Sequence, residues 1–396
     1  ASETHFAQPR IRGYFLDASG HPKVAGTLLR NPAYATTLRT LARDGAQAFY
    51  RGAIAGDIVA TANGYATNPG DLSLADLSDY QAVERSAVCG GYRTYRVCGV
   101  PPPSSGGITL LQTLGMLERF DVRAMGVQSL WSVHFIGEAE RLAYADRGAF
   151  IADPAFFAVP EGLLDASYLA ERSSLIRSDT VFNRAQPGAP VQTYRTGGRA
   201  MAQGERDAAE FPSTTHVVVV DGEGNAVSMT TTIENEFGSR LMTAGGFLLN
   251  NELTDFAFSP VDANGRPVAN RVEPRKRPRS TMAPTIVSDR LGRVVFLTGS
   301  PGGPAIAHYV ATTVIGVLDW QLDPQAAVSL PNFGSRNGPT QLEAGTAVAD
   351  LAPKLRAMGY DVSVGTETSG LQLIVRTRDG WAGGADPRRE GVVRGR

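Results

Sequence analysis

The stretch PSTTHVVVVDGEGNAVSMTTTIENEFG, residues 212 to 238, carries hydroxyl side chains at both of its ends. Its valine run, followed by the turn formers DGEGN, predicts two strands joined by a five-residue loop. If Val220 pairs with Ala226, the register places Thr214 opposite Thr232, with their Cβ atoms about 5 Å apart. The two threonines are either ordinary strand residues, since strands favour β-branched side chains, or a pair that can do nucleophilic chemistry.

A threonine can be an acyl-transfer nucleophile without a histidine if its own α-amine acts as the base. This requires the threonine to be the first residue of a chain, and Thr214 is internal. The chemistry therefore requires cleavage of the bond between Ser213 and Thr214. Residues 176–210 lose hydrophobic periodicity and are rich in Gly, Pro, Arg, Ser and Ala, which predicts an exposed connection in which a scissile bond can be reached.

The stretch TGSPGGPAIAHYV predicts a strand end, a glycine turn at Gly302 and Gly303, and a helix that begins near Pro304. No side chain covers the backbone N–H groups of such a turn, and the dipole of the helix favours negative charge beside it. The turn could therefore form an oxyanion hole for acyl transfer. A glycine turn that serves packing alone is the alternative reading.

Several other kinds of chemistry are disfavoured. The five histidines lack HExxH spacing, the two cysteines lack zinc spacing, no GxSxG elbow is present, and no GK[ST] follows GSPGG. We therefore expect no metal and no organic cofactor. The 38 basic and 39 acidic residues give a net charge of -1, which disfavours nucleic acid and anionic membranes as partners, and no transmembrane segment is predicted.

Helices and strands alternate along a chain whose 396 residues, 42% of them hydrophobic, can bury a large core. Asn31 and Pro32 form a good start for a helix, and Ser73 and Asp76 have the spacing of a capping box. Helices are expected over 31–62, 127–147, 304–320 and 348–358, and a leucine-rich helix follows PPPSSGG. Besides the threonine hairpin, strands are expected in FLLNN, APTIVSD, RVVFLTG and LQLIVRTRDGWAGGADP. This pattern predicts layered helices and sheets.

The two cysteines lie in the stretch VCGGYRTYRVCGV. If Arg93 and Thr94 form a two-residue turn, Cys89 and Cys98 face each other on adjacent strands. A disulfide in an oxidising compartment and two free thiols are both compatible with that register. The chain starts at Ala1 rather than Met, so its amino terminus is either processed or cut from a longer protein.

Nine stretches, in order from about residue 14 to residue 390, together resemble the γ-glutamyltransferase family of N-terminal-nucleophile hydrolases. They are AFYRGAIAGDIV, DLSDYQAVERSAVCGGYRTYRV, PPPSSGGI, EAERLAYADR, TTHVVVVDGEGNAVSMTTTIENEFGS, GFLLNNELTDF, KRPRSTMAPTIV, TGSPGG and GGADPRR. The resemblance implies an α+β fold, a four-layer αββα sandwich.

The resemblance also implies a precursor that cleaves itself between Ser213 and Thr214. Residues 1–213 would be the carboxy-terminal part of the large-subunit region, and residues 214–396 the small-subunit region with the nucleophile. The two segments would form one intertwined domain and stay associated. Thr214 would be the nucleophile that forms a γ-glutamyl ester, and Thr232 would support its hydroxyl.

Further residues match the binding and catalytic groups of the family. Gly302 and Gly303 match its oxyanion hole. The substrate's α-amino group would be held by side chains at Glu234, Glu252 and Asp255, and its α-carboxylate by the hydroxyls of Ser280 and Thr281. Carboxylates pair with an ammonium, and hydroxyls bond a carboxylate, through charge-assisted hydrogen bonds.

Three features depart from the family pattern. Glu234 stands where the family usually has Asn, and Thr281 stands where it usually has Ser. The family also has a further amino-terminal segment, with an arginine that clamps the α-carboxylate, to which nothing in this chain corresponds. The chain is therefore expected to be a fragment of the family's full length.

The resemblance implies a self-processing acyltransferase or hydrolase of glutathione and other γ-glutamyl compounds, with water, an amino acid or a peptide as acceptor. It also implies a periplasmic or extracellular location. The main alternative, suggested by Glu234, is an enzyme like the cephalosporin acylases. Such an enzyme acts on glutaryl side chains, which lack an α-amino group. An inactive fragment or non-catalytic homologue is the second alternative.

Overall fold

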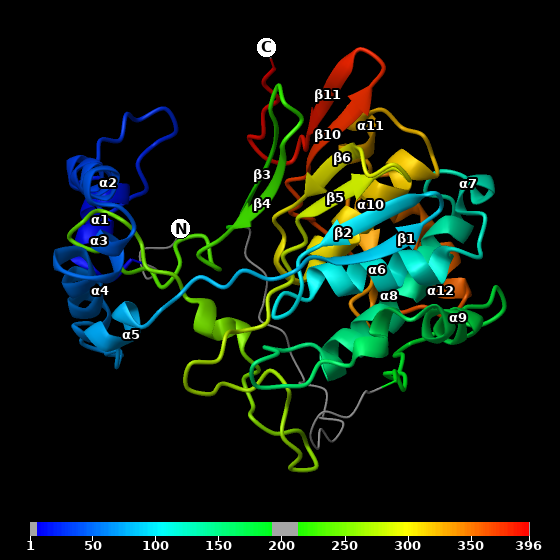
Figure 1. The fold of residues 1–396 in the computed structure, drawn as a ribbon, viewed down its shortest axis with the longest axis horizontal. Helices are drawn as coiled ribbons and strands as arrows, with labels where there is room; N and C mark the ends of the chain where they lie inside the picture. Colours follow the sequence, from blue (N-terminus) through cyan, green and yellow to red (C-terminus); the bar gives the residue numbers. More distant parts are fainter. Residues whose placement is uncertain (1–5, 192–212, 396) are drawn as a thin grey trace. The chain divides into compact units, whose positions relative to one another are not determined.

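The computed structural model describes residues 6–191 and 213–395, which divide into two compact units (Figure 1). Unit 1 comprises the described residues of Ala1–Glu84 together with Thr232–Glu252. Unit 2 comprises those of Arg85–Thr231 together with Leu253–Arg396. Each unit therefore takes residues from both sides of Thr214.

Unit 1 is built mainly from short helices. They are α1 (Pro9–Phe15), α2 (Pro32–Asp44), α3 (Gln47–Tyr50), α4 (Ala53–Asn63) and α5 (Leu74–Ser78). The side chain of Asn31 caps α2, and Ser73 forms the predicted capping box with Asp76. The helical character expected over 31–62 is confirmed, but the stretch is divided into α2, α3 and α4, because Gly45 and Gly52 adopt φ angles of 75° and 77°, which α-helical backbone does not allow.

The segment from Thr232 to Glu252 packs against these helices within unit 1. The carboxylate of Asp57 accepts hydrogen bonds from the backbone N–H groups of Ala244, at 2.9 Å, and Gly245, at 2.7 Å. The strand expected at FLLNN is absent, and an isolated bridge joins Met242 to Leu248 in its place. Leu249 donates to the carbonyl of Leu241 at 2.9 Å and accepts from the N–H of Ser239 at 2.9 Å, so the pairing is confined to this short stretch and the strand prediction is wrong.

Unit 2 is centred on a six-stranded antiparallel sheet in the order β1-β2-β5-β6-β10-β11. Its strands are β1 (Val88–Tyr92), β2 (Tyr95–Gly99), β5 (Thr285–Ser288), β6 (Val294–Gly299), β10 (Gln372–Thr377) and β11 (Gly380–Ala385). In Figure 1, α6 (Gly106–Leu117), α8 (Leu130–Phe150) and α10 (Ile306–Leu318) lie to one side of this sheet. Their apolar side chains, Leu110 and Leu114 among them, form the main core.

Smaller elements complete unit 2. The remaining α-helices of the described residues are α7 (Val122–Met125), α9 (Ala166–Ser174), α11 (Pro324–Val328) and α12 (Ala352–Ala357). A smaller, mixed sheet consists of β7 (Phe333–Gly334), β8 (Thr340–Glu343) and β9 (Val362–Gly365). Strands β7 and β8 pair antiparallel, and β8 and β9 pair parallel. Residues 176–191 contain no helix or strand, as expected, while the rest of that predicted connection lies outside the described residues.

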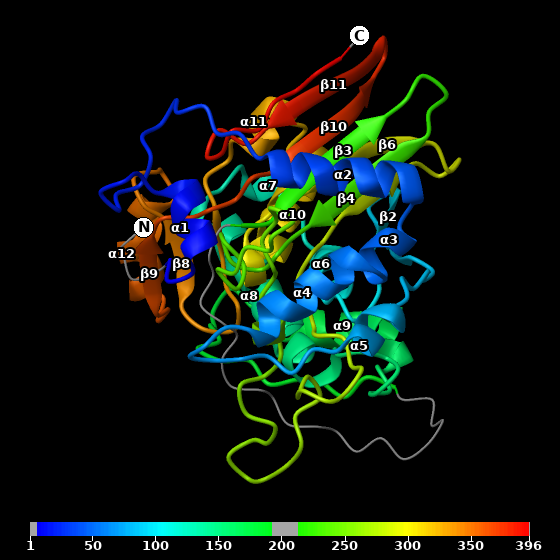
Figure 2. The ribbon, with the colours of Figure 1, turned by 90° about the vertical axis from the view of Figure 1, so that its left-hand side faces the viewer.

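The threonine hairpin forms as predicted, from β3 (Thr215–Val220) and β4 (Ala226–Thr231). Val220 pairs with Ala226, and the pairing continues to Thr215 and Thr231. The hairpin contacts β6 and β10, and Figures 1 and 2 place it on the side of the large sheet away from α6 and α10. Helices and two sheets are therefore layered in unit 2, and the predicted α+β class is confirmed.

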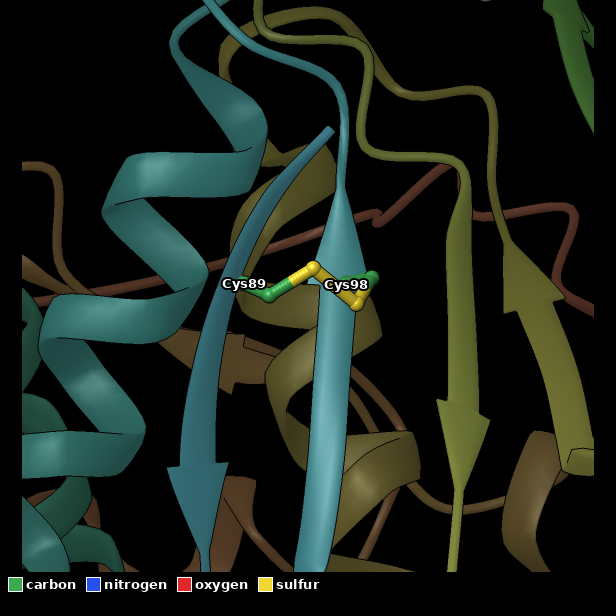
Figure 3. The surroundings of a disulfide bond; sticks show 2 residues. All are labelled: Cys89 and Cys98. Carbon is green, nitrogen blue, oxygen red and sulfur yellow. A yellow bond between two sulfur atoms is a disulfide. The ribbon is translucent and has the colours of Figure 1, made fainter. Parts of the chain in front are cut away.

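The cysteine hairpin also forms, with Cys89 paired to Cys98 across β1 and β2. The two sulfurs are bonded, so the disulfide rather than the pair of free thiols is present (Figure 3).

In the described part of the chain, no helix is both long enough and apolar enough to cross a membrane.

Candidate active site

Thr214, the predicted nucleophile, directly precedes β3 in unit 2. Its side chain and backbone together are only 8% exposed, and Ser213 before it is half-buried. The carbonyl oxygen of Thr214 accepts a hydrogen bond from Nη1 of Arg389 at 3.4 Å. The same guanidinium donates from Nε to the carbonyl of Thr368 at 3.0 Å, which fixes its position. The carboxy-terminal segment thus holds the backbone of Thr214, a contact for which the sequence carried no local signal.

A cavity of ≈ 380 Å³ lies beside Thr214. It is lined by the first residues of β3, by Pro301 and by the carboxy-terminal segment from Arg389 to Arg394. Residues at and beside β10, between Gly370 and Ile374, also contribute to the lining, whereas Gly302 and Gly303 do not line this cavity.

His216, two residues after Thr214, is buried and links the hairpin to the large sheet. Its Nδ1 lies 2.8 Å from Oγ1 of Thr230, and its Nε2 lies 3.3 Å from Oγ of Ser228. Ser228 in turn donates to the carbonyl of Thr298 on β6 at 3.0 Å. Burial lowers the pKa of His216 to about 4, so its imidazole is neutral near pH 7. Sequence reasoning assigned no role to this histidine.

The loop that contains Gly302 and Gly303 follows the end of β6. The two glycines have φ angles of 135° and 51°, and Gly303 begins a 3₁₀ turn, Gly303–Ala305, that leads into α10. A Cβ atom on Gly302 would lie 2.4 Å from the ring of Tyr309, so only glycine fits there. The strand, glycine turn and helix predicted from this stretch are therefore present.

Two tyrosine side chains hold this loop. The hydroxyl of Tyr144, on α8, donates to the carbonyl oxygen of Pro304. Tyr309, on α10, packs against Gly302, and its hydroxyl donates to Oε2 of Glu367 at 2.6 Å. Side chains from two different helices therefore contact the loop, one at Gly302 and one at the carbonyl of Pro304.

Ser280 and Thr281, the predicted carboxylate-binding pair, lie in unit 2. Oγ of Ser280 donates to Oγ of Ser104 at 2.8 Å, and Oγ1 of Thr281 accepts from Nη2 of Arg147 at 2.7 Å. Both hydroxyls are therefore positioned by residues from distant parts of the sequence.

The remaining predicted residues are divided between the units. Thr232, Glu234 and Glu252 belong to unit 1, whereas Asp255 belongs to unit 2. The amide of Glu234 donates to Oγ1 of Thr232 at 2.9 Å, and the carboxylate of Glu234 accepts from the side-chain amide of Asn251. The backbone carbonyl of Asp255 accepts a hydrogen bond from the side-chain amide of Asn270 at 2.7 Å. Since the paired part of the hairpin ends at Thr215 and Thr231, the contact between Thr214 and Thr232 stays a prediction.

The side chains of residues 6–191 and 213–395 contain no group of three His, Cys, Asp or Glu residues arranged to hold a metal ion.

The sequence profile of the family described as gamma-glutamyltranspeptidase matches residues 1–395. The chain is 35% identical over 377 residues to a glutathione hydrolase proenzyme of Escherichia coli, covering 93% of this chain and 62% of that protein. It is 34% identical to the acylase ACY 1 proenzyme of Pseudomonas sp. strain V22, over 92% of this chain and 61% of that protein. The chain therefore spans about three fifths of the length of these relatives.

The fold is similar to the crystal structure of a cephalosporin acylase from Bacillus halodurans. The TM-score is 0.82 at 25% sequence identity, over 98% of this chain and 67% of that one. This likeness confirms the predicted α+β fold of the N-terminal-nucleophile hydrolases.

Proposed function

Because the chain belongs to the gamma-glutamyltranspeptidase family, we propose that it is a self-processing threonine acyltransferase or hydrolase of γ-glutamyl compounds such as glutathione. The observation that carries the proposal is the position of Thr214. It directly precedes β3, its backbone is held by Arg389, and it lines the same cavity as Pro301 at the start of the glycine loop.

The proposed activity begins with cleavage of the chain. The hydroxyl oxygen of Thr214 attacks the carbonyl carbon of Ser213, and the peptide nitrogen leaves as the α-amine of Thr214. Water then hydrolyses the ester, which leaves a carboxylate on Ser213. The freed amine is the base that the threonine needs, and no histidine takes part.

In the acyl-transfer step, that amine accepts the hydroxyl proton while Oγ1 of Thr214 attacks the γ-carbonyl carbon of the donor. The backbone N–H groups of Gly302 and Gly303 stabilise the oxyanion, each contributing on the order of 3 kcal/mol. The amine of the leaving group takes the proton, and a γ-glutamyl ester remains. Water, an amino acid or a peptide then resolves the ester, so the kinetics are ping-pong.

Substrate binding is proposed from the family match of five residues. The carboxylates of Glu234, Glu252 and Asp255 would hold the α-ammonium, and the hydroxyls of Ser280 and Thr281 the α-carboxylate. The hydrogen bonds of Ser280 and Thr281 support their part, because they fix both hydroxyls in place.

A glutaryl acylase is the second candidate function. The identity to the acylase of Pseudomonas and the likeness to the cephalosporin acylase favour it, as does a third acidic side chain at Glu234. Donors separate the two activities, because a glutaryl amide lacks the α-ammonium that a γ-glutamyl amide carries. Faster turnover of the γ-glutamyl amide supports the first proposal, and faster turnover of the glutaryl amide supports the second.

We also propose that the protein works in the periplasm or outside the cell. The disulfide between Cys89 and Cys98 supports this location, because such bonds persist in oxidising compartments.

The decisive test is the intact mass of the purified protein after incubation, beside a Thr214→Ala variant. The proposal expects two fragments, residues 1–213 and 214–396, in the parent protein and a single mass in the variant. A single mass in both would contradict self-processing and favour an inactive fragment or non-catalytic homologue. Fragments without turnover of γ-glutamyl or glutaryl amides would contradict the enzymatic part alone.

A further inference from the structure

Three of the stretches that resemble the family meet around one buried guanidinium. Arg147, the last residue of EAERLAYADR, donates from Nε to Oγ of Ser105 in PPPSSGG at 2.8 Å. It donates from Nη2 to Oγ1 of Thr281 in KRPRSTMAP at 2.7 Å. Arg147 is only 4% exposed, Ser105 is fully buried, and Thr281 is 6% exposed.

Burying this charge costs free energy unless the guanidinium donors are paired, so the contacts to Ser105 and Thr281 define a built arrangement. A second guanidinium holds the backbone of Arg147, because Nη1 of Arg279 donates to the carbonyl of Arg147 at 3.0 Å. The charge of Arg147 is thus held beside the predicted carboxylate-binding pair.

The hydrogen bonds make the two hydroxyls of that pair unequal. A hydroxyl has one proton to donate, and Thr281 already accepts from Arg147, so its proton stays available. In the described ranges, no residue accepts that proton. Ser280 donates its proton to Oγ of Ser104, whose own proton goes to the carbonyl of Met282 at 2.7 Å. Ser280 is therefore committed as a donor within the protein.

A hydroxyl that accepts from a guanidinium is polarised and becomes a stronger donor to an anion. We propose that Arg147 is a positioning residue that makes the Thr281 hydroxyl the principal donor to the α-carboxylate of the substrate, with Ser280 in a lesser part. This inference rests on the proposed function, because the carboxylate subsite is assigned there.

Binding of two small probes tests the inference without requiring turnover. L-glutamate carries the α-carboxylate, and L-isoglutamine carries a carboxamide in its place. Calorimetry on the full chain is expected to show tighter binding of L-glutamate. Thr281→Val, which keeps the size of the side chain, is expected to weaken L-glutamate binding roughly 10- to 100-fold and L-isoglutamine binding less than about 3-fold.

Three further variants decide whether Arg147 acts through Thr281. Arg147→Gln is expected to lose the same preference for L-glutamate, and the double variant with Thr281→Val should lose little more. Ser280→Ala is expected to retain most of the preference. Arg119→Gln is the matched control, because Nε of Arg119 also donates to a serine hydroxyl, that of Ser173, at 2.8 Å.

The outcomes separate the two proposals. The inference would be overturned if Thr281→Val weakened the binding of both probes equally, or if Ser280→Ala weakened L-glutamate binding more than Thr281→Val did. It would also be overturned if the parent protein did not bind L-glutamate more tightly than L-isoglutamine. If Arg147→Gln does not fold, the comparison of Thr281→Val with Ser280→Ala still decides. A parent protein that prefers L-glutamate but turns over no γ-glutamyl amide would instead contradict the proposed function.

Discussion

At the scale of single residues, His216 is a neutral imidazole that anchors the strand following the predicted nucleophile, Thr214. Its ring bonds to Thr230 and lies 3.3 Å from Ser228, so it ties β3 to β4 and, through Ser228, to β6. Glycine at 299 makes room for the ring, since a Cβ there would lie 2.2 Å from it. Thr214 therefore directly precedes a strand that His216, two residues later, connects to the large sheet.

The lowered pKa of His216 predicts a loss of stability in acid. The folded protein keeps the imidazole neutral down to about pH 4, whereas the unfolded chain protonates it below 6.5. The stability present above pH 6.5 is therefore lost as the pH falls towards 4. In the uncleaved Thr214→Ala chain, the free energy of unfolding measured in urea should fall between pH 7 and about pH 4.5. His216→Gln should make this fall smaller by about 2 kcal/mol.

The matched control for this measurement is His21→Gln, because His21 is exposed. It should leave the loss of stability in acid unchanged. An equal pH dependence in the His216→Gln variant and its parent would show that this imidazole does not carry the effect.

At the scale of elements, helices α8 and α10 fix the glycine loop between them. Tyr144 of α8 bonds the Pro304 carbonyl, and Tyr309 of α10 packs on Gly302. An oxyanion hole depends on donors that already point in the right direction before the charge develops. The two helices therefore supply the rigidity that the glycines themselves lack.

Tyr144→Phe is expected to lower kcat about 10-fold while KM changes less than about 2-fold, because the loop loses an anchor that matters for the oxyanion and not for ground-state binding. Steady-state kinetics with a γ-glutamyl anilide measure both constants. Tyr168→Phe is the control, since it removes another buried hydroxyl, which donates to Asp146 at 2.6 Å. Equal losses of kcat in both variants would mean that Tyr144 has no special part.

Local signals predicted the elements well where the pattern was regular. The hairpin register, the Asn31 cap and the Ser73–Asp76 capping box are confirmed because neighbouring residues alone determine them. The stretch over 31–62 is helical as predicted, but two glycines with positive φ divide it into three helices. The strand at FLLNN was wrong because its backbone forms only an isolated bridge with the stretch just before it.

The predicted site residues could be named from the sequence, but their supports could not. Arg147 and Thr281 are 134 positions apart, and Arg389 and Thr214 are 175 apart. No periodicity or spacing rule connects residues so distant, since only the packing of α8 and the carboxy-terminal segment brings them together. The roles of these residues in catalysis and binding stay predictions that the proposed experiments address.

At the scale of the whole molecule, the predicted cleavage leaves a sheet that neither segment can build alone. Strands β1 and β2 precede Thr214, and β5, β6, β10 and β11 follow it. The pairing of β2 with β5, from Arg96 and Ser288 to Gly99 and Thr285, joins the two groups. Separation of the segments would expose this pairing and the core beneath the sheet.

The cleaved protein is therefore expected to elute as one species in gel filtration under native conditions, and as two in strong denaturant. The elution volume of the Thr214→Ala chain gives the reference for an undissociated molecule. Two native peaks of the sizes of residues 1–213 and 214–396 would contradict the shared sheet as the basis of association.

Both sulfur atoms of the disulfide belong to the segment before Thr214, and the chain has no other cysteine. The bond would therefore close a loop inside one product of the predicted cleavage and form no covalent bridge to the other. Electrophoresis in detergent without a reducing agent would accordingly resolve two bands. After the predicted cleavage, non-covalent contacts alone would keep the two segments together, so the cleaved protein, unlike a single chain, is expected to dissociate on sufficient dilution.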